Sequence, residues 1–594
     1  MFNKTLGTTI TIDEMPALND IGTMFSSLRR GRGHGEDSLP NELYLCDPDF
    51  WSTVVHPLLL KSFCRVQEPL PWKGGMLIDI FKGSGDRTDP KNSRGVFIED
   101  SLAKIYHSWL RRRLMLRYQK VAHSATYGGT PKRGTDMCAH QALAAWELAH
   151  AMKVSMAQVF VDIVGAFDGL VRQVVMGYDD LPVGDAAIIT LLAALGFGPD
   201  SVHDLAHQLS QGSILEKADV PQEVRRAVGD AHSHTWFSVQ GCRPVSEALS
   251  GSRPGDPLGD IIFNFVETSI HAEIGEGFAD APFVLVLPPL PEKLQTPFLP
   301  NDPAEVKFNN YVDDDAFPMI AETPRLMLDY LGQAIAVIAR AFRRHCLTLN
   351  LKANKTEVMI SFVGKGAKQA LKELVIDNES LVRVSGDDVC PGSPDLALRA
   401  VAWYRHMGHA TSSGGGFLQE AKHRAAETFS AYRSLRRRVV RNSLLLDHTR
   451  ISLSKSLMHS RLFYGAALWH CESTRAMRVI SHAYTVPIRD SLGMMNVDAK
   501  IGTAVPKVNL TTDAQVLVQA GLPRALTRAR IDRMRYACRL FANGPDLLVR
   551  LALACFEHAG SWTREVFLDF QSVWISGAEF ASHLPGPILF LPLG

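Results

Sequence analysis

The sequence predicts a fold of the α+β class, and three stretches carry that prediction. The run GMLIDIFKG at 75–83 has the apolar character of a short strand, and a helical pattern follows it at 99–121. The run AQVFVDIVGAFDGLV at 157–171 has the length and β-branched content of a buried strand. After about residue 420 the sequence is mainly helical and rich in arginine. Strands and helices therefore share the first part of the chain, and helices dominate the rest.

Length and composition limit the class of protein. The chain has 594 residues, 46% of them hydrophobic and 21% charged, which is ordinary globular composition and predicts several domains. The net charge of +1 means that any case for nucleic acid must rest on local charge. Nine cysteines without CxxC pairs favour reduced thiols. The first residues lack a signal-peptide pattern, and the apolar run at 185–198 is too short for a bilayer, so we expect a soluble intracellular protein.

The elements follow in order along the chain. A Gly/Arg-rich stretch at 29–40 predicts a loop. Two Gly/Pro-rich segments, at 250–260 and 286–303, also predict loops, and the second has the character of an insertion. In the predicted helix 99–121 five apolar residues recur at helical spacing: Leu102, Ile105, Tyr106, Trp109 and Leu110.

Three consecutive aspartates, Asp313, Asp314 and Asp315, stand among apolar residues in NNYVDDDAFP at 309–318. The flanking segments FNNYV and AFPMI have the character of two short strands, with the aspartates at the connecting turn. Adjacent carboxylates at a hairpin tip can converge on a cation, whose charge offsets their mutual repulsion. Aspartate is also common in solvated turns, so the triplet alone leaves both interpretations open.

A further acidic residue favours the metal site. Asp162 stands inside the predicted strand, where a charge is costly unless it is paired or bound to a metal. Carboxylate ligands suit Mg²⁺, and two such ions can activate an attacking hydroxyl and stabilise a leaving pyrophosphate. We therefore predict that Asp162, Asp313 and Asp314 hold two Mg²⁺ ions, or Mn²⁺, for phosphoryl transfer. Asp168 is predicted to be a helix N-cap.

Several motifs in a fixed order resemble the reverse transcriptase of non-LTR, LINE-like retrotransposons. The resemblance covers roughly residues 30–490. VDIVGAFD (161–168), GSRPGDPLGDIIFNF (251–265), YVDD (311–314) and LTLNLKANKTEVM (347–359) are similar to four successive palm motifs. YRHMGH (404–409) is similar to the primer grip, and residues 72–114 are similar to the fingers. RLFYGAALWH (461–470) and RARIDRMRYACRL (528–540) are similar to thumb and post-thumb segments.

The resemblance implies roles for the acidic site. Asp162 and Asp313 would bridge both metal ions and Asp314 would support them, because Tyr311 occupies the aromatic position that sets the register of the third motif. Lys355 would be the lysine that protonates the leaving pyrophosphate. Asp315 would begin the return strand with its carboxylate toward solvent or a nearby base, and would be the expendable member of the triplet.

The resemblance also implies contacts to substrate and nucleic acid. Lys82 and Arg94 would neutralise the triphosphate, Phe167 would exclude a ribose 2′-OH, and Arg253 and Gly255 would lie at the nucleotide. Primer and template contacts are expected from six residues: Tyr404, Met407, Gly408, Arg433, Arg436 and Arg437. A local block of positive charge is formed by Arg433, Arg436, Arg437, Arg438 and Arg441. It could be a solvated helix face. Contact with a phosphate backbone is equally plausible, because such contact needs only positive charge.

Two positions depart from the family pattern. Pro254 stands where the second motif usually has Gln, and proline cannot supply that side-chain hydrogen bonding. Gly255 still permits close backbone approach. Gly259 replaces the usual Ser, and the spacing from Asn350 to Lys355 is longer than the pattern.

The expected architecture is a right-hand polymerase with an antiparallel palm sheet. It would comprise an N-terminal extension (1–70), fingers and palm (71–395), a primer-grip hairpin and helical thumb (396–500), and a helical C-terminal domain (501–594). The expected reaction is extension of a DNA primer, or of nicked target DNA, on an RNA template with dNTPs. No endonuclease motif is present, so we expect that enzyme to come from elsewhere. The expected location is the nucleus, without a membrane.

Two other functions remain open. The chain could be a catalytically silent RNA-binding protein that keeps the polymerase fold, as a maturase-like or decayed copy would. An RNA-dependent RNA polymerase fits less well, because those enzymes usually have Gly-Asp-Asp where this chain has Val-Asp-Asp, and a small or polar residue in place of Phe167.

Overall fold

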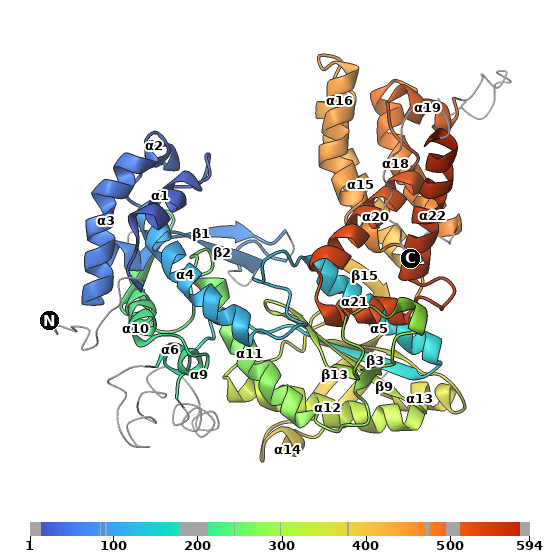
Figure 1. Ribbon diagram of the computed structural model, residues 1–594, viewed down its shortest axis with the longest axis horizontal. Coiled ribbons are helices and arrows are strands. Elements are labelled where there is room, and N and C mark those ends of the chain that lie inside the picture. The colour runs from blue at the N-terminus through green and yellow to red at the C-terminus, as the bar shows by residue number, and fades with distance from the viewer. Residues whose placement is uncertain are drawn as a thin grey trace.

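The computed structural model shows a mixed fold of helices and small sheets, in keeping with the predicted α+β class (Figure 1). It describes residues 14–83, 85–89, 92–177, 190, 212–242, 244–297, 299–376, 379–470, 474–494 and 511–581. The apolar run at 185–198 lies outside the described residues apart from Thr190. Within the described residues, no helix combines the length and the apolarity that crossing a bilayer requires.

The N-terminal helices pack beside the first sheet, at the left of Figure 1. They are α1 (Leu18–Ser26), α2 (Asn41–Leu45) and α3 (Pro48–Arg65), and α1 contacts α4 (Ser101–Val121). The helix α3 begins where the Asp47 carboxylate accepts the Phe50 N–H at 3.0 Å, with Pro48 in the first helical position. The loop predicted at 29–40 is confirmed, as is the helix predicted at 99–121, which buries four of its five periodic apolar residues.

The first sheet has the strand order β2-β1-β4-β5. Its strands are β1 (Gly74–Phe81), β2 (Ser93–Ile98), β4 (Thr235–Val239) and β5 (Val245–Ala248). The strand β1 confirms the prediction from GMLIDIFKG; it pairs antiparallel with β2 and parallel with β4. Three short helices precede β4 in the chain: α6 (Arg172–Met176), α9 (Ile214–Lys217) and α10 (Gln222–Ala231).

The central sheet has seven strands in the order β11-β12-β13-β10-β3-β9-β8. They are β3 (Ser155–Val161), β8 (Asn309–Tyr311), β9 (Asp314–Ala321), β10 (Glu357–Ser361), β11 (Val375–Ile376), β12 (Glu379–Val384) and β13 (Leu396–Val401). The predicted antiparallel sheet is antiparallel at every pair except one, because β10 and β13 run parallel. All seven residues of β3 are buried, as in a strand covered on both faces.

Long helices cover this sheet. The helix α12 (Pro324–Arg344) contacts β3, β9 and β12, and α5 (Thr135–Met152) contacts β3, β8 and β9. The helix α11 (Gly259–Gly277) lies against α12 and α4, and so joins the two sheets. The predicted insertion at 286–303 is enclosed by the strand pair β6 (Leu285–Leu287) and β7 (Ala304–Val306) and contains one helical turn, η4 (Glu292–Leu294). The helices α13 (Ala367–Glu373) and α14 (Gly386–Val389) lie between strands of the sheet in sequence.

The remaining chain is a two-stranded hairpin followed by helices, which rise above the central sheet at the right of Figure 1. The hairpin consists of β14 (Trp403–His406) and β15 (His409–Ser412), and its turn residues Met407 and Gly408 both have positive φ. The larger helices are α15 (Leu418–Leu435), α16 (Asp447–Ser454), α18 (Thr474–Ser491), α19 (Asp513–Gln519), α20 (Ala525–Asn543), α21 (Asp546–Ala554) and α22 (Trp562–Ala581). Between them lie two π-helical turns, η5 (Arg436–Val440) and η6 (Lys455–His459), and the short α17 (Ser460–Leu462) and η7 (Ala466–Leu468). The predicted helical character after residue 420 is confirmed.

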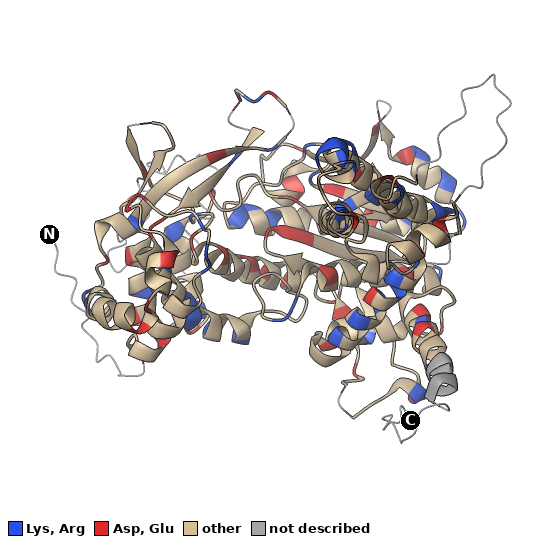
Figure 2. Ribbon diagram, turned by 90° about the horizontal axis from the view of Figure 1, so that it is seen from above, with Lys and Arg blue, Asp and Glu red and all other residues tan. Residues whose placement is uncertain are grey.

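The distribution of charged residues and the state of the cysteines agree with what the composition predicts. Figure 2 shows Lys and Arg interspersed with Asp and Glu across the molecule. The eight cysteines within the described residues are all free, as predicted.

Candidate active site

The strand β3 delivers Asp162 to the edge of the core. Asp162 directly follows the fully buried strand and is itself half-buried. Its backbone is fixed on both sides: its N–H donates to the Thr356 hydroxyl at 3.1 Å, and its carbonyl accepts from that hydroxyl at 3.0 Å and from the Asn350 N–H at 2.8 Å. The acidic side chain therefore leaves a rigid backbone position.

The hairpin β8–β9 delivers the other aspartates. Tyr311 pairs with Asp314, so Val312 and Asp313 form a two-residue turn, as predicted for the triplet with a shift of one residue. Val312 has φ +60°, an uncommon conformation for a β-branched residue. The Asn310 side-chain amide donates to the Val312 carbonyl at 2.8 Å. A Cβ on Gly128 would lie 2.4 Å from the Val312 nitrogen, so the glycine lets another backbone segment run against the turn.

The sheet register brings the two acidic segments together. Val161 pairs with Asp315 across β3 and β9, so Asp162 and Asp314 are the next residues at the same end of the two strands. Burial, then the charges of Asp162 and Asp315, raise the pKa of Asp313. Desolvation by the surrounding protein, although part of the residue reaches solvent, and then the charges of Asp313, Asp162 and Asp315 raise the pKa of Asp314 to about 7. The carboxylates repel one another, and a cation would relieve that repulsion.

The donor set of Asp162, Asp313 and Asp314 contains only oxygen, which fits Mg²⁺. Asp313 is half-buried and Asp314 is exposed, so the turn is open to solvent. Within the described residues, these three are not among the groups whose ligand atoms all lie within 4.8 Å of one another. Their side chains would therefore have to rotate toward a shared ion.

Lys355 completes the cluster of charges. Its ammonium lies 2.9 Å from Asp162 Oδ1, and the Asn350 amide donates to Asp162 Oδ2 at 2.8 Å. The Lys355 carbonyl accepts from the Tyr404 hydroxyl at 2.7 Å, and the Tyr404 ring stacks on Phe160 at 4.1 Å with an interplanar angle of 9°. The hairpin β14–β15 is thus bound to the segment that holds Lys355.

The third aspartate is buried. Asp315 is 1% exposed, and its Oδ1 accepts from Asn310 at 2.9 Å and lies 2.9 Å from His271 Nε2. Glu267 Oε2 is 3.5 Å from the same imidazole nitrogen. Of the two expectations for this carboxylate, solvent is wrong and a nearby base is confirmed. Burial, then the charges of Asp315 and Asp313, hold the pKa of Glu267 well above its ordinary value.

Two buried groups of acidic and histidine side chains have their ligand atoms within 4.8 Å of one another and could hold a metal ion. One is the group Glu267, His271 and Asp315. The other is Glu99, His107 and Asp256, which joins β2, α4 and the loop before α11. Sequence analysis predicted neither, because their members are widely separated along the chain and each appears as an ordinary core position.

The group around His107 already contains cations. His107 Nε2 lies 3.0 Å from Glu68, its Nδ1 lies 3.2 Å from Asp256, and Arg253 lies 2.5 Å from Asp256. Burial opposes a charge on His107, but the carboxylates of Asp256, Glu68 and Glu99 raise its pKa well above its ordinary value. Burial, then the charge of Asp256, raise the pKa of Glu99. His107 and Arg253 face the carboxylates of Glu68 and Asp256, so this group serves as an ion-pair network that ties three segments together.

Arg253 and Gly255 both lie against the backbone of neighbouring segments. Arg253 is 6% exposed, donates to the Trp72 carbonyl at 3.2 Å, and lies over the Phe97 ring at 5.8 Å. Gly255 has φ +111°, and a Cβ there would lie 2.7 Å from the Phe97 carbonyl oxygen. The Phe97 N–H donates to the Pro254 carbonyl at 3.2 Å. The close approach expected of Gly255 is found, and it is to strand β2.

Lys82 and Arg94 lie on the first sheet and are both exposed. Ile80 pairs with Arg94, and the Lys82 N–H continues the ladder to the Asn92 carbonyl at 2.8 Å. Strand alternation then puts Lys82 and Arg94 on one face as diagonal neighbours.

Phe167 lies in the turn after Asp162 and is half-buried, with its ring 5.2 Å from that of Phe263. Its carbonyl accepts the Ser252 N–H at 2.8 Å, which joins the first and second motifs. The N-cap predicted for Asp168 is wrong, because Asp168 lies in this same turn and α6 is preceded by Val171.

The hairpin β14–β15 is fixed from the helical side. The Met407 carbonyl accepts from the Tyr464 hydroxyl at 3.0 Å, and the Gly408 carbonyl accepts from Arg424. Glu420 accepts the Ala410 N–H at 2.6 Å and pairs with Arg424 at 2.6 Å. Met407 itself is buried, so this turn presents backbone more than side chain.

The arginine block divides into two sets. Arg436 and Arg441 pair with Asp490 at 2.9 and 2.7 Å, which lowers the pKa of that carboxyl against its burial. Arg433, Arg437 and Arg438 are exposed. The three exposed arginines are therefore the ones that could face solvent or bind phosphate, whereas Arg436 is paired with Asp490.

The sequence-predicted residues thus fall into two groups. Asp162, Asp313, Asp314, Lys355 and Tyr404 lie together around the end of β3, while Lys82 and Arg94 lie on another sheet. Asn350 and Asn310 were missed as site residues, although each stands inside a quoted motif; their polar side chains in apolar runs were the available signal. No model of a known protein family matches this chain, and no curated protein matches it.

Proposed function

We propose that this chain is an RNA-directed DNA polymerase of the non-LTR retrotransposon type, with a right-hand polymerase architecture. In this assignment the central sheet is the palm, the first sheet with its helices forms the fingers, and α15–α18 form the thumb. The observation that carries the proposal is the meeting of Asp162, Asp313, Asp314 and Lys355 from three segments of the chain at the end of β3. The motif order that predicted those residues supports the same assignment.

The acidic residues would hold Mg²⁺. Asp162, Asp313 and Asp314 would be the ligands, and the chemistry supplied by Mg²⁺ held there would be activation of the primer 3′-hydroxyl and stabilisation of the leaving pyrophosphate. The Asn350 amide and the Lys355 ammonium each engage one Asp162 oxygen and so orient that carboxylate. Lys355 is half-exposed and is the proposed proton donor to the leaving group. The strained turn at Val312 fixes the backbone of Asp313, from which its side chain would turn toward an ion.

The other residues bind substrates. Lys82 and Arg94 present two cations on one face of a hairpin, a suitable arrangement for a triphosphate. Phe167, fixed against Phe263, would exclude a ribose 2′-hydroxyl and so select dNTPs. The exposed Arg433 and Arg437, with the hairpin of Tyr404, Met407 and Gly408, would contact the primer and the RNA template.

Primer extension tests the proposal. Purified protein with oligo-dT on poly-A, dNTPs and Mg²⁺ should extend the primer, and NTPs should be used far less. Asp313→Ala should abolish extension, whereas Asp388→Ala, an exposed residue of α14, should retain it. Extension that survives Asp313→Ala would remove the assignment.

A catalytically silent RNA-binding protein is the second candidate. Pro254 favours it, because the position of the usual Gln is occupied by a residue whose carbonyl is engaged by the Phe97 N–H. RNA binding in a gel shift, with no extension in Mg²⁺ or Mn²⁺ and none after Pro254→Gln, would select this candidate.

A further inference from the structure

A pocket lies among the C-terminal helices, away from the acidic site. Its volume is about 450 Å³, in the range of pockets that hold small molecules. Its walls come from η6, α17, α18, α20 and the turn before α20. The helix α20 contributes Arg528 and Asp532, and the facing wall includes Lys455, Ser456, His459 and Ser460.

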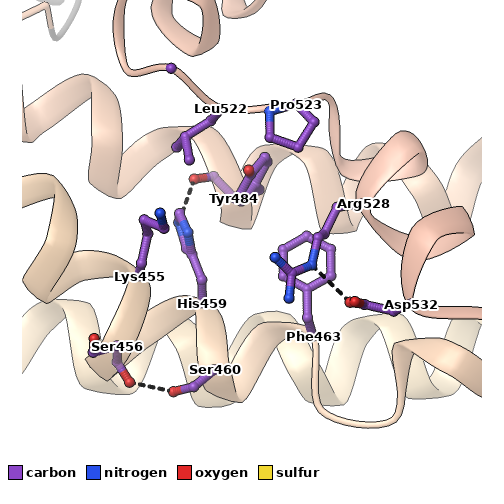
Figure 3. A pocket seen from close by; sticks show the side chains of 11 residues that line it. Lys455, Ser456, His459, Ser460, Phe463, Tyr484, Leu522, Pro523, Arg528 and Asp532 are labelled. Carbon is purple, nitrogen blue, oxygen red and sulfur yellow. Dashed lines mark hydrogen bonds and ion pairs between the residues drawn. The ribbon is translucent and has the colours of Figure 1, made fainter. Parts of the chain in front are cut away.

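The polar groups of the pocket suit a phosphate and a sugar. Lys455 and Arg528 are exposed cations on opposite sides, as Figure 3 shows. Between them His459 is 6% exposed and donates its Nε2–H to the Tyr484 carbonyl at 3.1 Å, so its ring is fixed. Burial, then the charges of Lys455 and Arg528, lower the pKa of His459 to about 4, in keeping with a positive field in the pocket. The exposed hydroxyls of Ser456 and Ser460 line the same wall.

The flat groups suit a base. The Arg528 guanidinium lies over the Phe463 ring, 6.0 Å from its centroid, so the guanidinium is the flat surface that a base would meet (Figure 3). The half-buried Phe463 supports it and is fixed edge-on against Tyr484 at 5.2 Å and stacked against Trp469 at 5.9 Å. Aromatic faces and guanidinium planes are the surfaces on which unpaired RNA bases stack. Asp532 accepts from Arg528 Nε at 2.8 Å, which orients the guanidinium and places a hydrogen-bond acceptor for a base amino group in the wall.

We propose that this pocket binds one unpaired nucleotide of a bound RNA, with the base against Arg528 and Phe463 and the phosphate at Lys455. The inference rests on the proposed function in taking RNA as the ligand. The positive charge and the hydroxyls distinguish the pocket from an apolar peptide groove, and the aromatic wall distinguishes it from a bare phosphate site. A nucleotide held here would anchor single-stranded RNA to the helical half of the protein.

The test measures nucleotide binding without catalysis. Saturation-transfer NMR with AMP and fluorescence anisotropy with a labelled single-stranded RNA 12-mer are recorded on the full chain in EDTA and without dNTPs. We expect saturation of the adenine ring protons and competition between AMP and the RNA. Arg528→Gln and Phe463→Leu should each weaken RNA binding roughly fivefold to hundredfold, the range for loss of one stacked base. Lys455→Gln should weaken RNA binding and reduce its salt dependence, because it removes a phosphate contact. Arg524→Gln, an exposed arginine next to the same helix but outside the lining, is the matched control.

Each outcome decides between the possibilities. Lys455 is exposed, so Lys455→Gln reports binding even if Phe463→Leu unfolds the helices. Equal loss with Arg524→Gln, or competition by inorganic phosphate as strong as that by AMP, would overturn the nucleotide pocket. Primer extension by wild type together with unchanged binding in all three pocket variants would overturn this inference and leave the polymerase assignment standing. Variant-sensitive AMP binding without primer extension would do the reverse.

Discussion

His271 Nε2 lies 2.9 Å from Asp315 Oδ1, so an imidazole buried in α11 holds the carboxylate that follows the two candidate metal ligands. The same Asp315 oxygen accepts from Asn310, whose amide also donates to the Val312 carbonyl in the strained turn. His271 in turn stacks on Phe308 at 4.0 Å and 16°. A continuous set of contacts therefore runs from the helix to the turn that carries Asp313.

The first prediction is that Asp315 is needed. Asp315→Asn removes the charge that binds His271 and should lower kcat for primer extension roughly tenfold to hundredfold, because the turn shifts relative to Asp162. The KM for dNTP should change little. Asp313→Asn should still be more severe, since it removes a proposed metal ligand. His271→Gln keeps a donor and should retain more activity than His271→Leu.

Steady-state primer extension measures these effects, with thermal unfolding to exclude loss of fold. Glu322→Gln, an exposed acid just past the other end of β9, is the control. Full activity of Asp315→Asn would show that the buried carboxylate is expendable, as the family resemblance implied.

The second prediction concerns Lys355. Lys355→Ala removes the cation 2.9 Å from Asp162 and the proposed proton donor, and should lower kcat by about 10²-fold or more. Lys355→Arg should keep the ion pair but restore little of the rate, because a guanidinium does not release its proton. Lys352→Ala, an exposed lysine in the same loop, should be neutral in single-turnover assays. A rate unchanged by Lys355→Ala would leave the lysine as a surface charge.

Sequence analysis predicted the parts of the site that have local signals. The helix at 99–121, the strand before Asp162 and the hairpin around the aspartates follow from periodicity and turn chemistry. The contacts of Asn350 with Asp162 and of His271 with Asp315 join residues 188 and 44 positions apart, and no local pattern specifies such pairs. The parallel pairing of β10 with β13 was missed for the same reason, because register and direction depend on the packed sheet.

The burial of Arg253 shows a further limit. From sequence it is one more arginine in a Gly/Pro-rich loop, where a solvated or ligand-binding role is the usual expectation. In the structure the buried guanidinium is stabilised by an ion pair with Asp256, three residues on. The same carboxylate also contacts His107, which lies on another element. Composition could not reveal that partnership, because the acid and the histidine come from different segments.

The third prediction separates the two sets of arginines. Replacing Arg433, Arg437 and Arg438 together by Gln should weaken RNA binding and reduce the slope of log K against log salt by about 2, as expected for loss of three phosphate contacts on a single strand. Arg436→Gln should instead lower thermal stability, because it breaks the pair with Asp490, and should leave the salt slope nearly unchanged. Anisotropy titrations from 50 to 300 mM KCl measure the slopes. Equal slopes for wild type and the triple variant would show a solvated helix face.

The fourth prediction is a pH dependence of stability at the contact between His470 and Glu147 on α5. The two side chains are largely buried and lie 2.8 Å apart. Although burial opposes it, the Glu147 charge raises the pKa of His470 to about 9, whereas the unfolded value is about 6.5. Since the folded pKa is the higher one, the stabilisation is complete below about pH 6.5 and is lost as the pH rises through 9. The pKa of Glu147 is lowered despite burial, chiefly by His470, so its contribution is lost on the acid side.

His470→Gln should therefore destabilise the protein by about 2 kcal/mol near pH 6 and by much less at pH 10. Thermal unfolding of wild type and variant across this range measures the difference. His448→Gln, an exposed histidine of α16, should show no such pH-dependent difference. A destabilisation by His470→Gln that is the same at pH 6 and pH 10 would mean that the imidazole acts by packing and by its hydrogen bond to the Gly560 carbonyl at 2.9 Å, and not as a charge.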